Sequence, residues 1–207
     1  MKRSIATVLL ASFAVLLVSL PLVAVGDGTD EAEDSPSAPR IIRESPQPEG
    51  FPEPTAVGEI VVKDYPAYRS AKVARGEANR NSMFRSLFRH ITRNDVSMTA
   101  PVEMTYDEDG PTSMSFLYGS LEIGEPGEDG VVEVADQAAA TVVAIGVRGS
   151  YTQQRYEENL ALLTKWLAAN ADQWEVVGEP RQLSFNSPFV PGVMKYSEVQ
   201  IPIRAVE

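Results

Sequence analysis

The chain has 207 residues, which is enough for one domain of ordinary size plus appended segments. It contains no cysteine, so disulfides, thiolate metal ligands and attachment of a lipid or cofactor to a thiol are excluded. The formal net charge of -11 argues against general binding to nucleic acid, because a polyanion would be repelled.

The first 26 residues have the pattern of a secretory signal. Lys2 and Arg3 form a positively charged start, and residues 5–25 are almost wholly apolar. Small residues at 24–26 offer a cleavage site, but the apolar run also approaches the roughly 20 residues that span a bilayer. Residues 1–26 are therefore predicted to be either a cleaved signal peptide or a retained membrane anchor. Both alternatives place the rest of the chain outside the cytoplasm.

Residues 27–58 are rich in Pro, Ser, Asp and Glu. They offer few apolar side chains to offset chain entropy, so we predict an acidic, disordered or extended linker. The folded domain is then expected to occupy residues 59–207.

The domain opens with a pattern of strands and one helix. Residues 59–76 predict two strands that are broken at Tyr65-Pro66, because proline cannot donate a hydrogen bond to a sheet. Residues 77–91 predict a helix with one apolar stripe. The members of the stripe are Met83, Phe84, Leu87, Phe88 and Ile91. Two further strands are predicted at 102–106 and 114–118, separated by the turn DEDGP.

The second half repeats this order. A strand over 139–149 ends in Arg148-Gly149, as the earlier strand ends in Arg75-Gly76, and a helix follows each. The later strands are expected at 174–177, 181–185 and 196–203. Two strand–helix–strand–strand units in tandem predict an α+β fold with pseudo-twofold symmetry.

Three stretches carry a resemblance to a known family. They are VVKDYPAYRSAKV (61–73), VSMTAPVEM (96–104) and LSFNSPFVPGVMKYSEVQIPI (183–203). In this order and spacing they resemble the SOUL, or haem-binding protein, family over residues 59–203. The resemblance implies a distorted eight-stranded antiparallel β-barrel, built from a duplicated unit and flanked by two α-helices. It also implies a hydrophobic groove for haem or another tetrapyrrole, held non-covalently and reversibly beside the first helix and the late loop.

The first helix carries a basic ridge beside its apolar stripe. Seven basic residues lie between Arg69 and Arg93, against Glu77 alone, and Arg85, Arg89 and Arg93 recur every four residues. Such a ridge suits a flat ligand with two carboxylates, whose propionates would pair with guanidinium groups. The alternative is a solvated helix face that is paired with acidic neighbours.

The predicted binding residues lie on this helix and on the loop 186–195. The expected contacts with the ligand are Met83, Phe84, Arg85, Leu87, Arg89, His90, Phe189, Val193 and Met194. Arg85 and Arg89 are expected to hold propionates, and His90, the only histidine, is the candidate axial ligand of the iron. The alternative for His90 is a boundary residue with its polar tip in water. The alternative for the loop is that it closes the core.

The motif Met98–Val102 is expected to be architectural, since Pro101 cannot donate to a sheet and favours extended backbone before it. No nucleophile lies beside a base, so an enzyme is not expected. The sequence therefore predicts an exported protein that binds a tetrapyrrole for sequestration, buffering or transfer, and contacts a membrane only through its N-terminal segment. Two alternatives stay open: a small-molecule or protein-interaction domain without tetrapyrrole affinity, and a hydrolase-like enzyme that uses Glu103.

Overall fold

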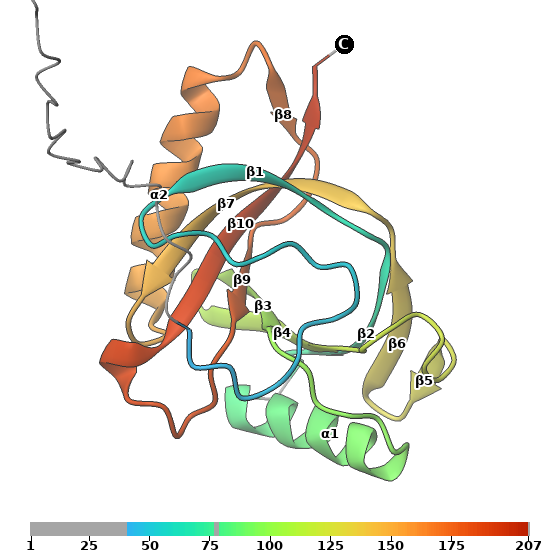
Figure 1. Cartoon of the computed structure of the whole chain (residues 1–207). Helices are drawn as coiled ribbons and strands as arrows, with labels where there is room; N and C mark the ends of the chain where they lie inside the picture. The colour runs from blue at the N-terminus through green and yellow to red at the C-terminus, as the bar shows by residue number, and fades with distance from the viewer. Residues whose placement is uncertain (1–40, 77–78, 207) are drawn as a thin grey trace, which may run out of the picture. The chain divides into compact units, whose positions relative to one another are not determined.

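The computed structural model describes residues 41–76 and 79–206, which form one antiparallel sheet of ten strands and two α-helices (Figure 1). The elements are β1 (Ile60–Tyr65), β2 (Tyr68–Ala74), α1 (Arg80–Arg93), β3 (Val102–Asp107), β4 (Gly110–Leu117), β5 (Gly127–Asp129), β6 (Val132–Gln137), β7 (Ala140–Arg148), α2 (Gln153–Ala169), β8 (Trp174–Val176), β9 (Arg181–Ser184), the 3-10 turn η1 (Gly192–Met194) and β10 (Tyr196–Ala205). The predicted leader, residues 1–26, lies outside the described residues. In the described part of the chain, neither helix has the length and apolar character needed to cross a bilayer.

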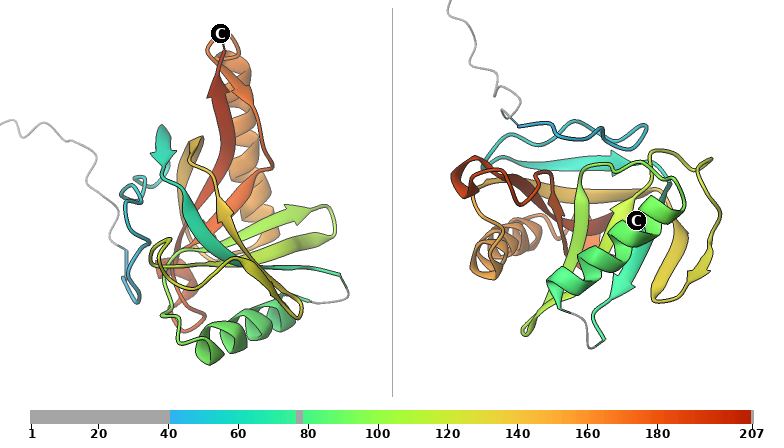
Figure 2. Two further views of the ribbon diagram at one scale, coloured as in Figure 1. Left: turned by 90° about the vertical axis from the view of Figure 1, so that its right-hand side faces the viewer. Right: turned by 90° about the horizontal axis from the view of Figure 1, so that it is seen from below.

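The sheet is strongly curled but open. Its strands follow the order β1-β7-β10-β9-β3-β4-β2-β6-β5, and β8 pairs with β10. Pro66 and Ala67 alone connect β1 to β2, although these strands lie far apart in the order. The sheet must therefore curve to bring them together, as Figure 2 shows. Among the described residues the end strands β1 and β5 do not pair with each other, so the α+β class is confirmed and the closed, eight-stranded barrel is not.

The two strands that the sequence analysis missed are β5 and β6, which form an acidic hairpin around Gly130. The loop GEPGEDG contributes β5, and Val132 and Val134 point into the core from β6. The alternation of these two valines with polar residues was the available signal.

The strand order has a regularity of its own. Exchanging β1 with β6, β2 with β7, β3 with β9 and β4 with β10 reverses the order of these eight strands without otherwise changing it. A duplicated unit would give this order, and the duplication itself stays a prediction.

Each helix covers one apolar cluster. Helix α1 packs on β2, β4 and β6, and α2 packs on β7 and β10. In α1 the side chains of Met83, Leu87 and Ile91 are buried, which confirms most of the predicted stripe. Burial of such side chains contributes roughly 1.5–3 kcal/mol each, so the stripe fixes the rotation of the helix against the sheet.

Strand β10 divides the molecule into an apolar and a polar side. Successive side chains of a strand point to opposite faces. Val199 and Ile201 join the cluster beneath α2, and Tyr196, Glu198 and Gln200 point the other way, although all are buried. Polar side chains therefore occupy the concave face of the sheet, where each needs a hydrogen-bond partner.

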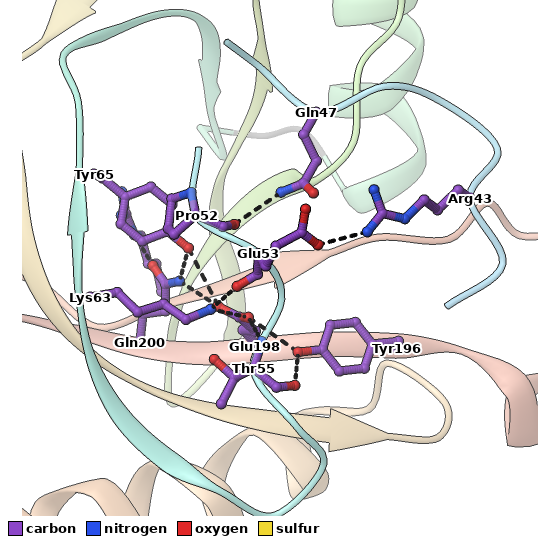
Figure 3. Close-up of polar contacts among 11 residues, drawn as sticks. Arg43, Gln47, Pro52, Glu53, Thr55, Lys63, Tyr65, Tyr196, Glu198 and Gln200 are labelled. Carbon is purple, nitrogen blue, oxygen red and sulfur yellow. Dashed lines mark hydrogen bonds and ion pairs between the residues drawn. The ribbon is translucent and has the colours of Figure 1, made fainter. Parts of the chain in front are cut away.

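Residues 41–58, which we call the strap, run in extended form along this concave face. The backbone N–H of Thr55 donates to Glu198 at 2.6 Å, and the Tyr196 hydroxyl donates to the Thr55 carbonyl at 2.6 Å (Figure 3). The Phe51 ring meets the Tyr65 ring edge-on at 4.9 Å between centroids. These residues fall in the predicted linker, and their contacts hold them against the sheet.

Glu198 is the centre of a buried ionic network. Its side chain is fully buried, and it accepts hydrogen bonds from Lys63 and Gln200, each at 2.8 Å. The Arg181 guanidinium donates to the other end of Gln200 at 3.0 Å and to Glu103 at 2.9 Å. Two ion pairs and their bridging amide thus link β1, β10, β9 and β3 on one face of the sheet.

Candidate ligand-binding cleft

A cleft of about 890 Å³ lies between α1, the segment that enters β3 and the chain on either side of the β9–β10 loop. This volume lies in the range of small-molecule sites. The apolar part of its lining consists of Phe84, Phe88, Met98, Ala100, Val102, Met104, Met114, Phe185 and Pro188. The polar part consists of Glu44, Ser45, Arg80, Asn81, Arg85, Thr99, Ser150, Tyr151, Ser184, Asn186, Ser187 and Lys195.

Helix α1 supplies one wall because of where it begins. The Asn79 side chain caps the helix by accepting from the backbone N–H groups of Asn81 and Ser82, each at 3.0 Å. With that start, Arg80, Phe84 and Phe88 fall on one face at intervals of four residues. The Phe84 and Phe88 rings stack at 6.1 Å between centroids. The wall is thus a pair of parallel aromatic rings with a guanidinium at one end.

The family-like motif forms the second wall. Met98, Thr99, Ala100 and Val102 all line the cleft. The Thr99 hydroxyl donates to the Leu117 carbonyl at 2.6 Å, which fixes the segment against the end of β4. The Ala100–Pro101 peptide bond is cis. The motif therefore has the expected architectural position, and it also contributes surface to the cleft.

Tyr151 forms the polar end of the cleft. Its hydroxyl donates to the Tyr196 carbonyl at 2.9 Å and accepts from the Asn186 N–H at 2.8 Å. Burial raises the pKa of Tyr151 to about 12, so the phenol is neutral at physiological pH. Lys195 lies over the Tyr151 ring at 5.1 Å from the ring centroid, and Arg80 donates to the backbone carbonyl of Tyr151 at 3.3 Å. Two cations therefore lie beside a neutral phenol.

Ser184 adds an unsatisfied hydroxyl to this wall. Its Oγ is buried and has no hydrogen-bond partner, and the residue lines the cleft. A buried hydroxyl without a partner costs about 1–3 kcal/mol. A polar group of a bound ligand would remove that cost.

The structure brings together only some of the predicted binding residues. Phe84 and Arg85 line the cleft. Met83 and Leu87 do not, because both are fully buried in the core beneath α1. Arg89 is exposed on the same helix but lies outside the lining.

The loop residues differ from expectation in a similar way. The two ends of the loop line the cleft through Pro188 and Lys195. Phe189, Val193 and Met194 are exposed at its tip and are not part of the lining. The loop therefore borders the cleft without covering it.

His90 lies away from the cleft. Its side chain is buried, with Nδ1 at 2.5 Å from the Asp129 carboxylate and Nε2 at 2.8 Å from the Tyr118 hydroxyl. Arg93 also contacts Asp129, and hydrogen bonds from these two partners hold the pKa of Asp129 below its usual range. Both ring nitrogens are thus engaged, and they fasten α1 to β5 through Asp129 and to the end of β4 through Tyr118. Within residues 41–76 and 79–206 no group of three or more His, Asp or Glu side chains could hold a metal ion.

The basic ridge is partly paired. Of the seven predicted basic residues, Arg69, Arg75 and Arg93 form ion pairs with Asp136, Asp107 and Asp129 respectively. Arg85 and Arg89 have no ion-pair partner among the described residues. Glu103, the candidate acid of the enzymatic alternative, accepts from Arg181 and Tyr68 and does not line the cleft.

The strap closes one end of the cleft through Glu44. Its carboxylate accepts from the Ser187 hydroxyl at 2.6 Å and from the Ser187 N–H at 2.8 Å. These two bonds lower the pKa of Glu44 below its ordinary value. The sequence analysis missed this residue, because its partner lies 143 positions away and the surrounding composition is that of a linker.

A sequence profile of known proteins decides the family. The profile described as SOUL heme-binding protein matches residues 55–202. The chain belongs to the SOUL family. No curated protein matches the sequence significantly. The family suggests haem or a related tetrapyrrole as the ligand of this SOUL protein, and strap residues 41–54 lie outside the matched region.

Solved structures show that the fold is shared more widely. The EcmrR–DNA complex seen by cryo-electron microscopy has 12% identity and a TM-score of 0.56, with 72% of this chain and 58% of that chain covered. The C-terminal domain of EcmrR has 14% identity and a TM-score of 0.53, with 72% and 98% covered. A hydrolase from Listeria innocua has 9% identity and a TM-score of 0.53, with 72% and 93% covered. This SOUL protein thus spans little more than half of the first chain, and at these identities the likeness concerns the fold alone.

Proposed function

We propose that this SOUL protein binds haem or a related tetrapyrrole reversibly in the cleft beside α1, outside the cytoplasm. Its role would be sequestration, buffering or transfer. The observation that carries the proposal is the position of the cleft, which lies between the first helix and the late loop. Export is proposed from the sequence pattern of residues 1–26.

The two sides of the cleft match the two parts of such a ligand. The stacked rings of Phe84 and Phe88, with Met98 opposite on the motif, offer an apolar surface to a macrocycle. Arg80, Arg85 and Lys195 lie around the same cleft and would pair with propionates.

Iron ligation by imidazole is not part of the proposal. A haem would supply an iron centre with axial positions, and both nitrogens of His90 are already engaged by Asp129 and Tyr118. Met98 is the soft donor on the cleft wall that is not fully buried. We therefore expect reversible binding that depends chiefly on the apolar wall and on the cations.

Titration of the segment Ser35–Glu207 with hemin, followed by the Soret band, tests the proposal. This segment keeps the strap, which belongs to the folded unit. We expect saturable one-to-one binding that Arg85→Glu weakens about tenfold or more, because a charge-assisted hydrogen bond contributes roughly 1.5–3 kcal/mol. Arg89→Glu is the matched control, since it makes the same charge change one turn along α1 but outside the lining.

Three results would contradict the proposal. The absence of binding at micromolar hemin would favour a small-molecule or protein-interaction domain without tetrapyrrole affinity. Equal loss of affinity in the two variants would show that general charge, rather than a defined contact at Arg85, holds the ligand. A hydrolytic activity that is lost in Glu103→Gln would support the enzymatic alternative.

A further inference from the structure

The tip of the β9–β10 loop, residues 188–194, exposes apolar side chains to solvent. Phe189 is 94% exposed and Val193 is 80% exposed, and Met194 beside them is 46% exposed. Large apolar side chains that cluster on a protruding loop commonly mark an interaction site. Pro188 and Lys195 line the cleft, whereas Phe189, Val193 and Met194 do not, so closing the cleft does not account for these side chains.

The tip is held in a fixed shape from inside. Val190 is buried beneath it, and its N–H donates to the Ser187 carbonyl at 3.3 Å. The N–H of Met194 donates to the Pro191 carbonyl at 2.9 Å, and the Arg148 guanidinium donates to the Met194 carbonyl at 2.9 Å. The outward position of Phe189 and Val193 is therefore set before any partner arrives.

Several backbone positions of the tip present no free N–H group. Backbone groups that enter lipid must have their hydrogen bonds satisfied internally. Pro188 and Pro191 have no N–H group, and the N–H groups of Phe189, Val190 and Met194 all have partners within the loop. A protein partner could itself supply hydrogen bonds to the tip, whereas the acyl chains of a lipid could not.

Basic side chains surround the base of the tip. Lys195 follows it directly, and Arg148 binds its carbonyl. Arg155 donates to the carbonyl of Arg148, and Arg80 donates to that of Tyr151. The acidic side chain that contacts this loop is Glu44. In a chain with a formal net charge of -11, this collection of cations is local and complements an anionic surface.

From these observations we propose that the loop tip inserts Phe189 and Val193 into the surface of a bilayer that contains anionic phospholipid. Lys195 and its basic neighbours would contact the headgroups. Phe88, which is half exposed, lines the same cleft as Pro188 and Lys195 at the ends of this loop, so docking would bring the cleft close to the lipid. This contact is separate from the N-terminal segment and does not depend on the identity of the cleft ligand.

Vesicle co-sedimentation of the segment Ser35–Glu207 tests this proposal, since all three apolar clusters lie within it. Vesicles of phosphatidylcholine alone are compared with vesicles that also contain phosphatidylglycerol. We expect binding to the mixed vesicles, weaker binding to phosphatidylcholine, and a loss of about tenfold or more in the variant Phe189→Asp/Val193→Asp. Lys195→Glu should reduce binding about fivefold or more, because each cation near an anionic surface contributes roughly that factor.

The matched control is Val131→Asp, which places a charge on a valine that is 70% exposed in the β5–β6 turn. It should bind vesicles as the parent does, and hemin affinity should be unchanged in Phe189→Asp/Val193→Asp, since neither residue lines the cleft. Three results would overturn the proposal: no binding to mixed vesicles, equal loss in the control and tip variants, or loss of hemin affinity without loss of vesicle binding. The last result would instead assign the tip to the tetrapyrrole. Light scattering of the free protein should show a monomer, because a dimer formed through the tip would cover Phe189 and Val193.

Discussion

Replacing Glu198 with glutamine tests how far the buried network holds the strap and the sheet together. One carboxylate oxygen accepts from Thr55, Lys63 and Tyr196, at 2.6, 2.8 and 3.1 Å. The other accepts from Gln200 at 2.8 Å. An amide can offer an oxygen at only one of the two places, and its NH₂ group would face a donor at the other.

The expected loss in the free energy of unfolding follows from this geometry. The backbone N–H of Thr55 cannot reverse, so the new amide oxygen must stay beside it and the NH₂ group must face Gln200. Gln200 can turn its own amide, but it then loses the bond from Arg181 at 3.0 Å. Lys63, whose side chain is 9% exposed, loses its counter-charge as well. Breaking a buried ion pair from one side costs about 3–5 kcal/mol.

Urea unfolding followed by tryptophan fluorescence measures this loss in the free energy of unfolding. The corresponding decrease in Tm is roughly 6–20 °C for a domain of this size. Glu175→Gln is the matched control, because it removes one charge from the exposed Glu175–Arg204 pair and should change stability by less than about 1 kcal/mol. A loss below about 1 kcal/mol in Glu198→Gln would refute the reasoning. In the double variant with Lys63→Met, the loss should be smaller than the sum of the two single losses.

Three further outcomes are expected. His90→Ala should leave the Soret band of the hemin complex unchanged while lowering stability by about 2–4 kcal/mol, because it removes a buried side chain and leaves the buried Tyr118 hydroxyl without its partner; a changed spectrum would indicate that His90 contacts the haem. Glu44→Gln should speed proteolysis of the strap at neutral pH. Folding lowers the pKa of Glu44 from 4.5. The stabilisation of the strap by this carboxylate is therefore present above pH 4.5 and is lost as the pH falls through the folded pKa, and cleavage of the strap in the parent should rise in the same pH window. Gly146→Ala should cost about 1–3 kcal/mol by urea unfolding, since its Cβ would lie 2.5 Å from the Thr55 carbonyl, and Gly119→Ala, whose Cβ meets only a side chain at 3.4 Å, should cost less.

Much of the fold could be predicted because its signals are local. The helical spacing of Met83, Leu87 and Ile91 sets the buried face of α1, and Tyr65-Pro66 ends β1 where the sequence indicates. The cleft could also be expected beside the first helix and the late loop. Within it, however, the apolar stripe was read as the ligand surface. The structure uses most of that stripe for the core, and it leaves Phe84 and Phe88 at its edge for the cleft.

The remaining features depend on contacts between distant positions. His90 meets Asp129 across 39 positions, and Thr55 meets Glu198 across 143. No local pattern distinguishes a buried histidine with two partners from one that is free to bind metal. The composition of residues 41–58 is that of a linker, and contacts with distant residues, among them those of Glu44, Phe51 and Thr55, hold it against the domain. The curl of the sheet likewise follows from which strands pair. The alternation of apolar and polar residues in one strand does not determine its partners.

The position of β10 in the sheet has a consequence for how the chain acquires its structure. This strand follows the other described elements in the chain, yet it lies between β7 and β9 near the middle of the order. Without residues 196–205, β7 and β9 each have an unpaired edge, and the strap lacks Glu198, which accepts from Thr55. The sheet can therefore be completed only after residues 196–205 join it, so its assembly depends on contacts between positions far apart in the chain.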